Sequence, residues 1–106
     1  MAQETTALER ALPHSLDAER TVLGAILIEN EAFHHASELL TERDFYREAH
    51  RKIFFRMASL AARGDAIDLV TLKAEISRAG ELDSVGGVTY LSSLVEGVHR
   101  ATHVPY

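Results

Sequence analysis

FYREAHRKIFFRMASLAARG, residues 45–64, carries the clearest periodic pattern in the sequence. Apolar side chains recur along it every three or four positions, at Tyr46, Ala49, Ile53, Met57 and Leu60. This spacing predicts a helix with one apolar face. Arg63 and Gly64 are typical of a helix end, because a cation suits the negative end of the helix dipole and glycine readily adopts a left-handed backbone. We therefore expect a central helix at about Tyr46–Arg63.

The rest of the chain contains shorter helical patterns separated by capping residues and glycines. We expect helices at residues 16–28, 31–39, 69–79 and 88–95, with Ser15, Asn30 and Asp68 as caps of the first three, and a tight helical turn at 41–45 with Thr41 as its cap. Because valine and threonine favour strands, a strand is the alternative for residues 88–95. Pro105 suits the first turn of a sixth helix. The predicted fold is an all-α, compact bundle of about five to six helices around the central helix. Residues 1–13 are expected to form a flexible tail and residues 14–106 the domain.

Each predicted helix has an expected inward face. For the 16–28 helix these residues are Leu16, Val22, Leu23, Ile26 and Leu27, and for 31–39 they are Ala32, Phe33, Ala36, Leu39 and the following Leu40. For 69–79 they are Leu69, Val70, Leu72, Ile76 and Ala79, and for 88–95 they are Leu91, Leu94 and Val95. Phe45 is expected to fill the core at the corner before the central helix.

Composition excludes several classes of protein. The 106 residues include no cysteine, which excludes a disulfide, a thiolate nucleophile and a cysteine-bound metal. The longest apolar run, residues 22–28, is too short to span a membrane, and residues 1–13 lack the features of a signal peptide. We expect a cytoplasmic protein. A net charge of -5 disfavours nucleic-acid binding by the domain as a whole, although six of the eleven basic residues lie between Arg43 and Arg63.

No pattern typical of a reactive site is present in the sequence. A phosphate-binding Gly-x-x-x-x-Gly-Lys-Ser/Thr motif is lacking. His99 and His103 are four residues apart, but no third ligand has suitable spacing, and His34 and His35 point in different directions on a helix. A triad of Ser92 or Ser93 with His99 and Asp83 has no supporting turn. We expect no catalytic, cofactor-binding or metal-binding residue.

Two residues of the first helix depart from its pattern. Glu19 projects onto the apolar side, where a carboxylate needs a partner, and His50 on the inner face of the central helix is the candidate. We interpret this as a buried structural pair and not as a catalytic dyad. Gly24 lies inside the helix, where glycine is unfavourable, and indicates close approach of a neighbouring helix.

A candidate contact surface lies on the polar side of the central helix. Phe55 stands near its middle and is accompanied by Arg51, Lys52 and Arg56. A subunit or partner contact is one interpretation, and a singly exposed phenylalanine is the other. The wider basic set of Arg47, Arg51, Lys52, Arg56 and Arg63 forms either a solvated face with Glu48–Lys52 pairing or a surface for DNA or an acidic partner.

Several short segments, in this order and with compatible spacing, resemble the N-terminal domain of the DnaB-type replicative DNA helicases. They are PHSLDAE (13–19), VLG (22–24), DFY (44–46), HRKIF (50–54), IDLVTL (67–72), GEL (80–82) and VGGVTYL (85–91). The resemblance implies a helical domain that is followed in the family by a helical hairpin, a linker and a RecA-like motor using ATP and Mg. It also implies a hexameric ring whose N-terminal collar contacts primase, possible contact with a helicase loader, and single-stranded DNA bound mainly by the motor.

The functional expectation is therefore a non-catalytic scaffolding and partner-binding domain of a replicative helicase that unwinds DNA at the replication fork. The sequence stops at Tyr106, before the hairpin, linker and motor of the family pattern. A free-standing helical adaptor without a motor is the alternative. A small enzyme is disfavoured because no reactive constellation was found.

Overall fold

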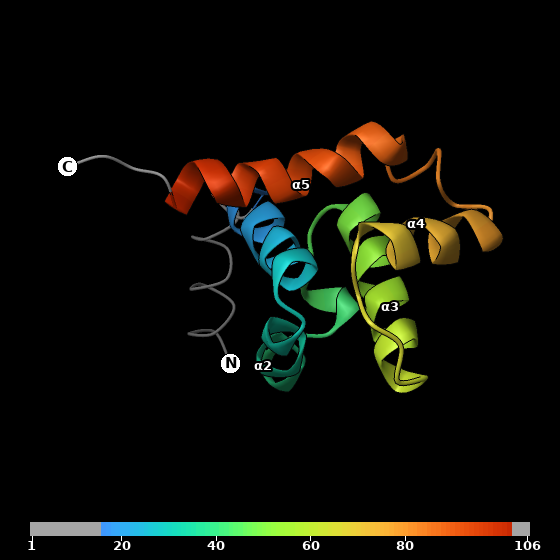
Figure 1. The fold of residues 1–106 in the computed structure, drawn as a ribbon, viewed down its shortest axis with the longest axis horizontal. Coiled ribbons are helices and arrows are strands. Elements are labelled where there is room, and N and C mark those ends of the chain that lie inside the picture. Colours follow the sequence, from blue (N-terminus) through green and yellow to red (C-terminus); the bar gives the residue numbers. More distant parts are fainter. Residues whose placement is uncertain (1–15, 103–106) are drawn as a thin grey trace.

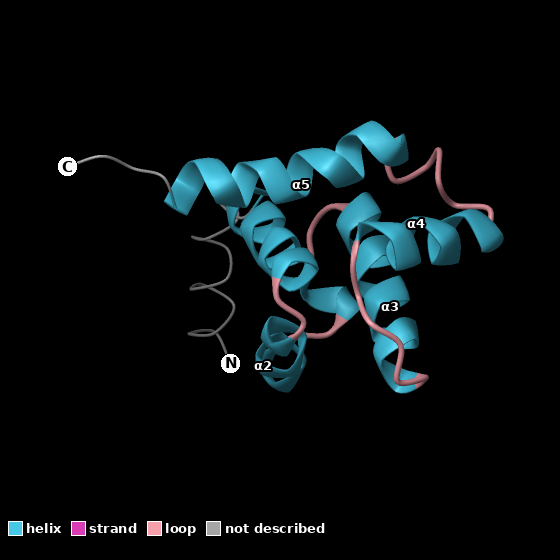
Figure 2. Cartoon of the chain, viewed as in Figure 1, coloured by secondary structure: helices cyan, strands magenta, loops and turns pink. Residues whose placement is uncertain are grey.

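The computed structural model describes the backbone of residues 16–102 and the side chains of residues 16–98. Within this range the chain forms a helix at residues 16–28, α2 (Glu31–Leu39), a short 3₁₀ turn η1 (Glu42–Asp44), α3 (Glu48–Ala62), α4 (Leu69–Arg78) and α5 (Gly87–Thr102). The predicted all-α fold is confirmed, since residues 16–102 contain no strand (Figure 2). The predicted tail, the Ser15 cap and the helix start at Pro105 lie outside these residues.

α5 lies across one end of both the 16–28 helix and α3, which run below it in Figure 1. α4 packs beside α3, and α2 lies at the far end of the 16–28 helix (Figure 1). α5 is longer than the predicted 88–95 segment. Leu91 and Leu94 are buried on its inner face and Val95 is half-buried, so packing outweighs the weak helix propensity of valine and threonine.

α3 is central to the core, as predicted. Ala49, Ile53, Met57 and Leu60 are buried on its inner face together with Phe54. The prediction for Tyr46 was wrong, because its side chain is 61% exposed. Arg47 has an extended backbone, so α3 begins only at Glu48, and Tyr46 lies in the bend before the helix.

Four other residues predicted to face inward are exposed: Leu16, Leu39, Val70 and Ala79. Val70 is 77% exposed because it precedes the buried Leu72 by two positions, which puts it on the opposite side of α4. Leu39 is 83% exposed at the last residue of α2, whose only buried residue is Phe33. Leu16 stands at the first described residue of its helix, and Ala79 follows the last residue of α4.

The predicted turns and caps are mostly confirmed. Capping boxes form at Thr41 with Asp44 and at Asp68 with Thr71, and Phe45 is buried after η1. Gly64 and Gly80 both have positive φ where α3 and α4 end.

Asn30 does not cap α2, which corrects the prediction. Its side chain makes no capping hydrogen bond and instead contacts the loop before α4. The Asn30 Oδ1 accepts from the Ile67 N–H at 2.8 Å, and the Asn30 Nδ2 donates to the Ile67 carbonyl at 2.5 Å. The Asn30 side chain therefore pairs with the backbone of Ile67 and anchors the α3–α4 loop.

Candidate partner-contact surface

The outward face of α3 brings together the four residues singled out in the sequence. Phe55 is 45% exposed, and with Arg51, Lys52 and Arg56 it borders a shallow depression of about 290 Å³. Three acidic residues complete the lining: Glu42 from η1, Glu48 from α3 and Glu81 from the loop after α4. Sequence reasoning missed Glu42 and Glu81 as members, because only the fold brings η1 and this loop to α3.

The Phe55 ring is in contact with the neighbouring Arg56 side chain. The Arg56 guanidinium lies 5.0 Å from the centroid of the Phe55 ring, a cation–π contact worth about 0.5–1 kcal/mol at an exposed site. The Arg56 Nε donates to Glu81 Oε1 at 3.1 Å, which ties the cation to the loop after α4. One side of the exposed ring is therefore covered by a cation that is itself tied to Glu81.

Arg51 and Lys52 are also engaged within the domain. The Arg51 guanidinium donates from Nε to the Phe45 carbonyl at 2.8 Å and from Nη2 to the Tyr46 carbonyl at 3.1 Å. The Lys52 Nζ lies 3.1 Å from the Ser84 Oγ and 3.7 Å from a Glu48 carboxylate oxygen. With three acidic and three basic residues around it, the depression is close to neutral. It suits a protein surface of mixed charge better than a phosphate backbone.

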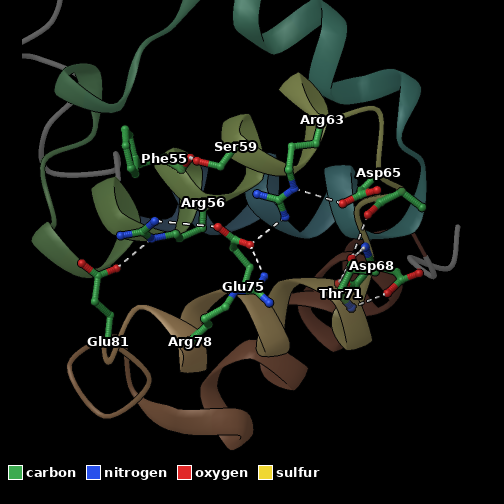
Figure 3. A network of polar contacts seen from close by, with 11 residues as sticks. Phe55, Arg56, Ser59, Arg63, Asp65, Asp68, Thr71, Glu75, Arg78 and Glu81 are labelled. Atoms are coloured by element: carbon green, nitrogen blue, oxygen red, sulfur yellow. Dashed lines mark hydrogen bonds and ion pairs between the residues drawn. The ribbon is translucent and has the colours of Figure 1, made fainter.

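A buried carboxylate, Glu75 on α4, pairs with basic side chains beside this surface (Figure 3). Glu75 is 6% exposed and accepts hydrogen bonds from Arg63 at 2.8 Å and from Arg78 at 2.6 Å, while Arg56 lies 3.8 Å away. The Arg63 and Arg78 hydrogen bonds lower the pKa of Glu75 to about 2. Arg56 lies on α3, Arg63 directly follows its last residue, and Glu75 and Arg78 lie on α4, so this network joins the two helices.

Most of the wider basic set is thus committed to ion pairs and hydrogen bonds inside the domain. Arg63 also donates to Asp65 at 3.2 Å, and Arg47 donates to the Tyr90 hydroxyl at 3.4 Å. This arrangement favours the structural interpretation of the set over a DNA-guiding one. Glu75 was missed in the sequence; its spacing from Arg78 was a signal, but its contacts with α3 depend on the fold.

Glu19 and His50, the polar pair expected from the sequence, lie in direct contact. The His50 Nδ1 is 2.7 Å from Glu19 Oε1, and the His50 Nε2 is 2.6 Å from the Tyr90 hydroxyl. Burial lowers the pKa of His50, which favours the neutral ring. A carboxylate accepts only, so Nδ1–H donates to Glu19, and Nε2 then accepts from the Tyr90 O–H. Tyr90 was not identified from the sequence.

Glu19 also accepts hydrogen bonds from backbone N–H groups at the start of α3. Its Oε2 accepts from the Tyr46 N–H at 2.5 Å and its Oε1 from the Arg47 N–H at 3.5 Å, while Arg47, the N-cap, makes no side-chain cap of its own. A negative group is favoured at this positive helix end. Both ring nitrogens of His50 are therefore engaged, one with the 16–28 helix and one with α5.

The sequence also raised histidines as metal ligands and serines as nucleophiles, and the structure describes some of these residues. Among the residues whose side chains the structure describes, no group of three histidine, aspartate or glutamate side chains could hold a metal ion. His99 and His103 lie outside that range. The Ser93 hydroxyl donates to the Tyr90 carbonyl within α5 at 2.6 Å. No helix in the described part of the chain has the length and apolarity to cross a membrane.

Comparison with known proteins finds replicative DNA helicases and a family model of their N-terminal domain. A family model described as the DnaB-like helicase N terminal domain matches residues 11–106. The replicative DNA helicase DnaB of Geobacillus stearothermophilus is 47% identical over 98 residues, which are 92% of this chain and 22% of that protein. The replicative DNA helicase DnaC of Bacillus subtilis is 40% identical over the same shares.

A solved structure shows the same fold. The crystal structure of the N-terminal domain of DnaB helicase from Mycobacterium tuberculosis superposes with a TM-score of 0.77 at 40% sequence identity. The match covers 78% of this chain and 60% of that one. The chain spans about one fifth of the length of these two relatives, at 22% of each.

Proposed function

The chain belongs to the family of DnaB-like helicase N-terminal domains, and from this premise we propose that it is the scaffolding and partner-binding domain of a replicative DNA helicase. The observation that carries the proposal is the family match over residues 11–106. The family membership confirms the resemblance seen in the sequence. Unwinding at the replication fork, with ATP and Mg, is proposed for a longer protein in which a RecA-like motor follows this domain.

The proposed role of the domain is geometric and not catalytic. Neighbouring copies would form a collar in a hexameric ring, and primase, with a possible helicase loader, would bind the collar and bias its arrangement. Single-stranded DNA is assigned mainly to the motor. The near-neutral charge of the α3 depression supports this division, because a phosphate backbone needs an excess of basic groups.

Within this role, we propose that the Phe55 surface, defined as Arg51, Lys52, Phe55 and Arg56 with the depression they border, meets a neighbouring subunit or primase. Aromatic and arginine side chains are enriched among residues that dominate binding energies. Phe55 offers an exposed aromatic ring beside Arg56, which contacts it through a cation–π interaction and pairs with Glu81. Most of the contact energy is expected at the ring, and the charged rim is expected to set orientation.

Light scattering tests the assembly part of the proposal. The chain is compared with a form extended through the helical hairpin that the family pattern places after Tyr106. We expect the extended form to assemble and the shorter one to remain of lower order. A free-standing adaptor predicts instead a stop codon soon after Tyr106 and no phosphate-loop motif further along the coding sequence.

A salt titration tests the assignment of DNA to the motor. The chain is mixed with single-stranded DNA at low salt, and we expect no binding. Binding that weakens steeply as salt rises would assign a DNA-guiding role to the basic side of α3.

A further inference from the structure

Three polar side chains, one from each of three helices, form a continuous hydrogen-bonded chain through the domain. Glu19 comes from the 16–28 helix, His50 from α3 and Tyr90 from α5. We propose that this chain, which we call the polar latch, fixes the angle of α5 on the domain, and that α5 pivots when the Tyr90 hydroxyl is released.

The pivot is the contact between Gly24 and α5. A Cβ added at Gly24 would lie 2.3 Å from the Leu94 carbonyl oxygen and 2.6 Å from a Val98 methyl carbon. The 16–28 helix therefore touches the backbone of α5 directly, and only glycine leaves room for this approach. This backbone contact fixes one point of α5, and the helix also packs on α4 and buries Leu91 and Leu94. Apolar contacts have little directional preference, so a hydrogen bond is suited to setting the angle of α5 about the Gly24 contact.

The polar latch supplies this directional contact. The Tyr90 ring is stacked on His50, with centroids 5.9 Å apart, and the Arg47 guanidinium lies 5.1 Å from the centroid of the Tyr90 ring. Gly86 packs against the base of Tyr90, since a Cβ there would lie 2.7 Å from the Tyr90 Cβ. The ring is thus closely surrounded, and its hydroxyl sets the final position through the 2.6 Å contact with His50.

The geometry amplifies small changes at the latch. At about 1.5 Å per helical residue, Tyr90 lies roughly 6 Å before Leu94, and Thr102 lies roughly 12 Å beyond it. A rotation that draws the hydroxyl about 1 Å away from His50 breaks the hydrogen bond and moves the far end of α5 by about 2 Å.

Glu19 can transmit a change in the 16–28 helix to α5, although it does not touch Tyr90. It fixes the tautomer of His50, and the tautomer decides whether Nε2 accepts from the tyrosine. The same carboxylate also holds the Tyr46 and Arg47 N–H groups at the start of α3. The consequence for a ring rests on the proposed function, in which α5 leads toward the rest of the helicase, but the pivot itself does not.

Nitrogen-15 relaxation dispersion on the 106-residue chain tests the latch with Tyr90→Phe. We expect microsecond-to-millisecond exchange in the α5 amides, from a second orientation populated at roughly 0.1–10%, and none in α2, which lies away from α5 (Figure 1). Tyr46→Phe is the matched control, because it removes the hydroxyl of an exposed tyrosine outside the latch, and it should leave α5 unchanged. Glu19→Gln should give an intermediate effect.

The proposal would be overturned by a Tyr90→Phe chain whose α5 amides show no exchange beyond the control, or whose α2 amides show the same exchange as α5. Either result would mean that the hydroxyl contributes stability without setting the angle of α5. If Tyr90→Phe does not fold, Glu19→Gln decides by the same criteria. No partner protein is present in this experiment, so its failure would leave the proposed function standing.

Discussion

Replacing Gly24 with alanine should destabilise the domain, against the usual effect of this change in a helix. Alanine is favoured over glycine inside a helix by about 1 kcal/mol. The new methyl would lie 2.3 Å from the Leu94 carbonyl oxygen, a backbone atom that moves only if α5 moves. Overpacking of this kind costs about 1–3 kcal/mol, and a backbone obstacle favours the upper end. We expect a net loss of about 2 kcal/mol, which lowers the Tm by roughly 10 °C.

Gly97→Ala is the matched control, because Gly97 also lies inside a helix but has no atom within 4 Å of an added Cβ. It should stabilise the chain by up to about 1 kcal/mol. The assay is urea unfolding of both variants beside the original chain, followed by circular dichroism. Equal stabilisation by the two substitutions would refute the close approach of α5 to Gly24.

Three further predictions concern polar groups. Asn30→Asp should lower the free energy of unfolding by about 1–3 kcal/mol in urea, because aspartate cannot donate to the Ile67 carbonyl; stability kept or raised would instead indicate an N-cap. The lowered pKa of Glu75, about 2 against an ordinary 4.5, means that its contribution to stability is complete above about pH 4.5 and is lost as the pH falls toward 2. Acid titration of unfolding should therefore show a slope in that window that Glu75→Gln flattens, and an unchanged slope would oppose the network. The pKa of His50 is lowered by burial, so the unfolded chain binds more protons just below pH 6.5, and stability should fall as the pH drops from there. His50→Gln should remove this slope, and its persistence would count against a neutral buried ring.

Local periodicity predicted most of the fold. The apolar spacing along α3 located its buried face, and the caps at Thr41 and Asp68 set the starts of η1 and α4. Single residues near helix ends were harder, because the face they share with the core depends on where the helix begins. Tyr46 shows this, since α3 begins only after it and its side chain is exposed.

Long-range partners could be predicted only where one residue was out of place in its own helix. Glu19 on an apolar face required a buried partner, which directed attention to His50. Tyr90 carried no such signal, because a tyrosine in a helix fits equally well at the surface, and it meets His50 across 40 positions of sequence. The role of Asn30 was predicted wrongly because its side-chain amide can hydrogen-bond equally well to a local helix start or to a distant loop, and the sequence does not distinguish the two.

The central claim is that this domain acts by presenting the Phe55 surface to another protein, and sedimentation velocity tests it most directly. The chain, in the form extended through the hairpin, is run alone and with primase from the same organism, beside Phe55→Ala and Leu39→Ala. Leu39 is the control because it is an apolar residue 83% exposed and does not line the depression. We predict that Phe55→Ala weakens self-association or primase binding at least about tenfold, as loss of a dominant contact does, while Leu39→Ala leaves both unchanged. A Phe55→Ala chain that assembles and binds primase as the original does would contradict the account.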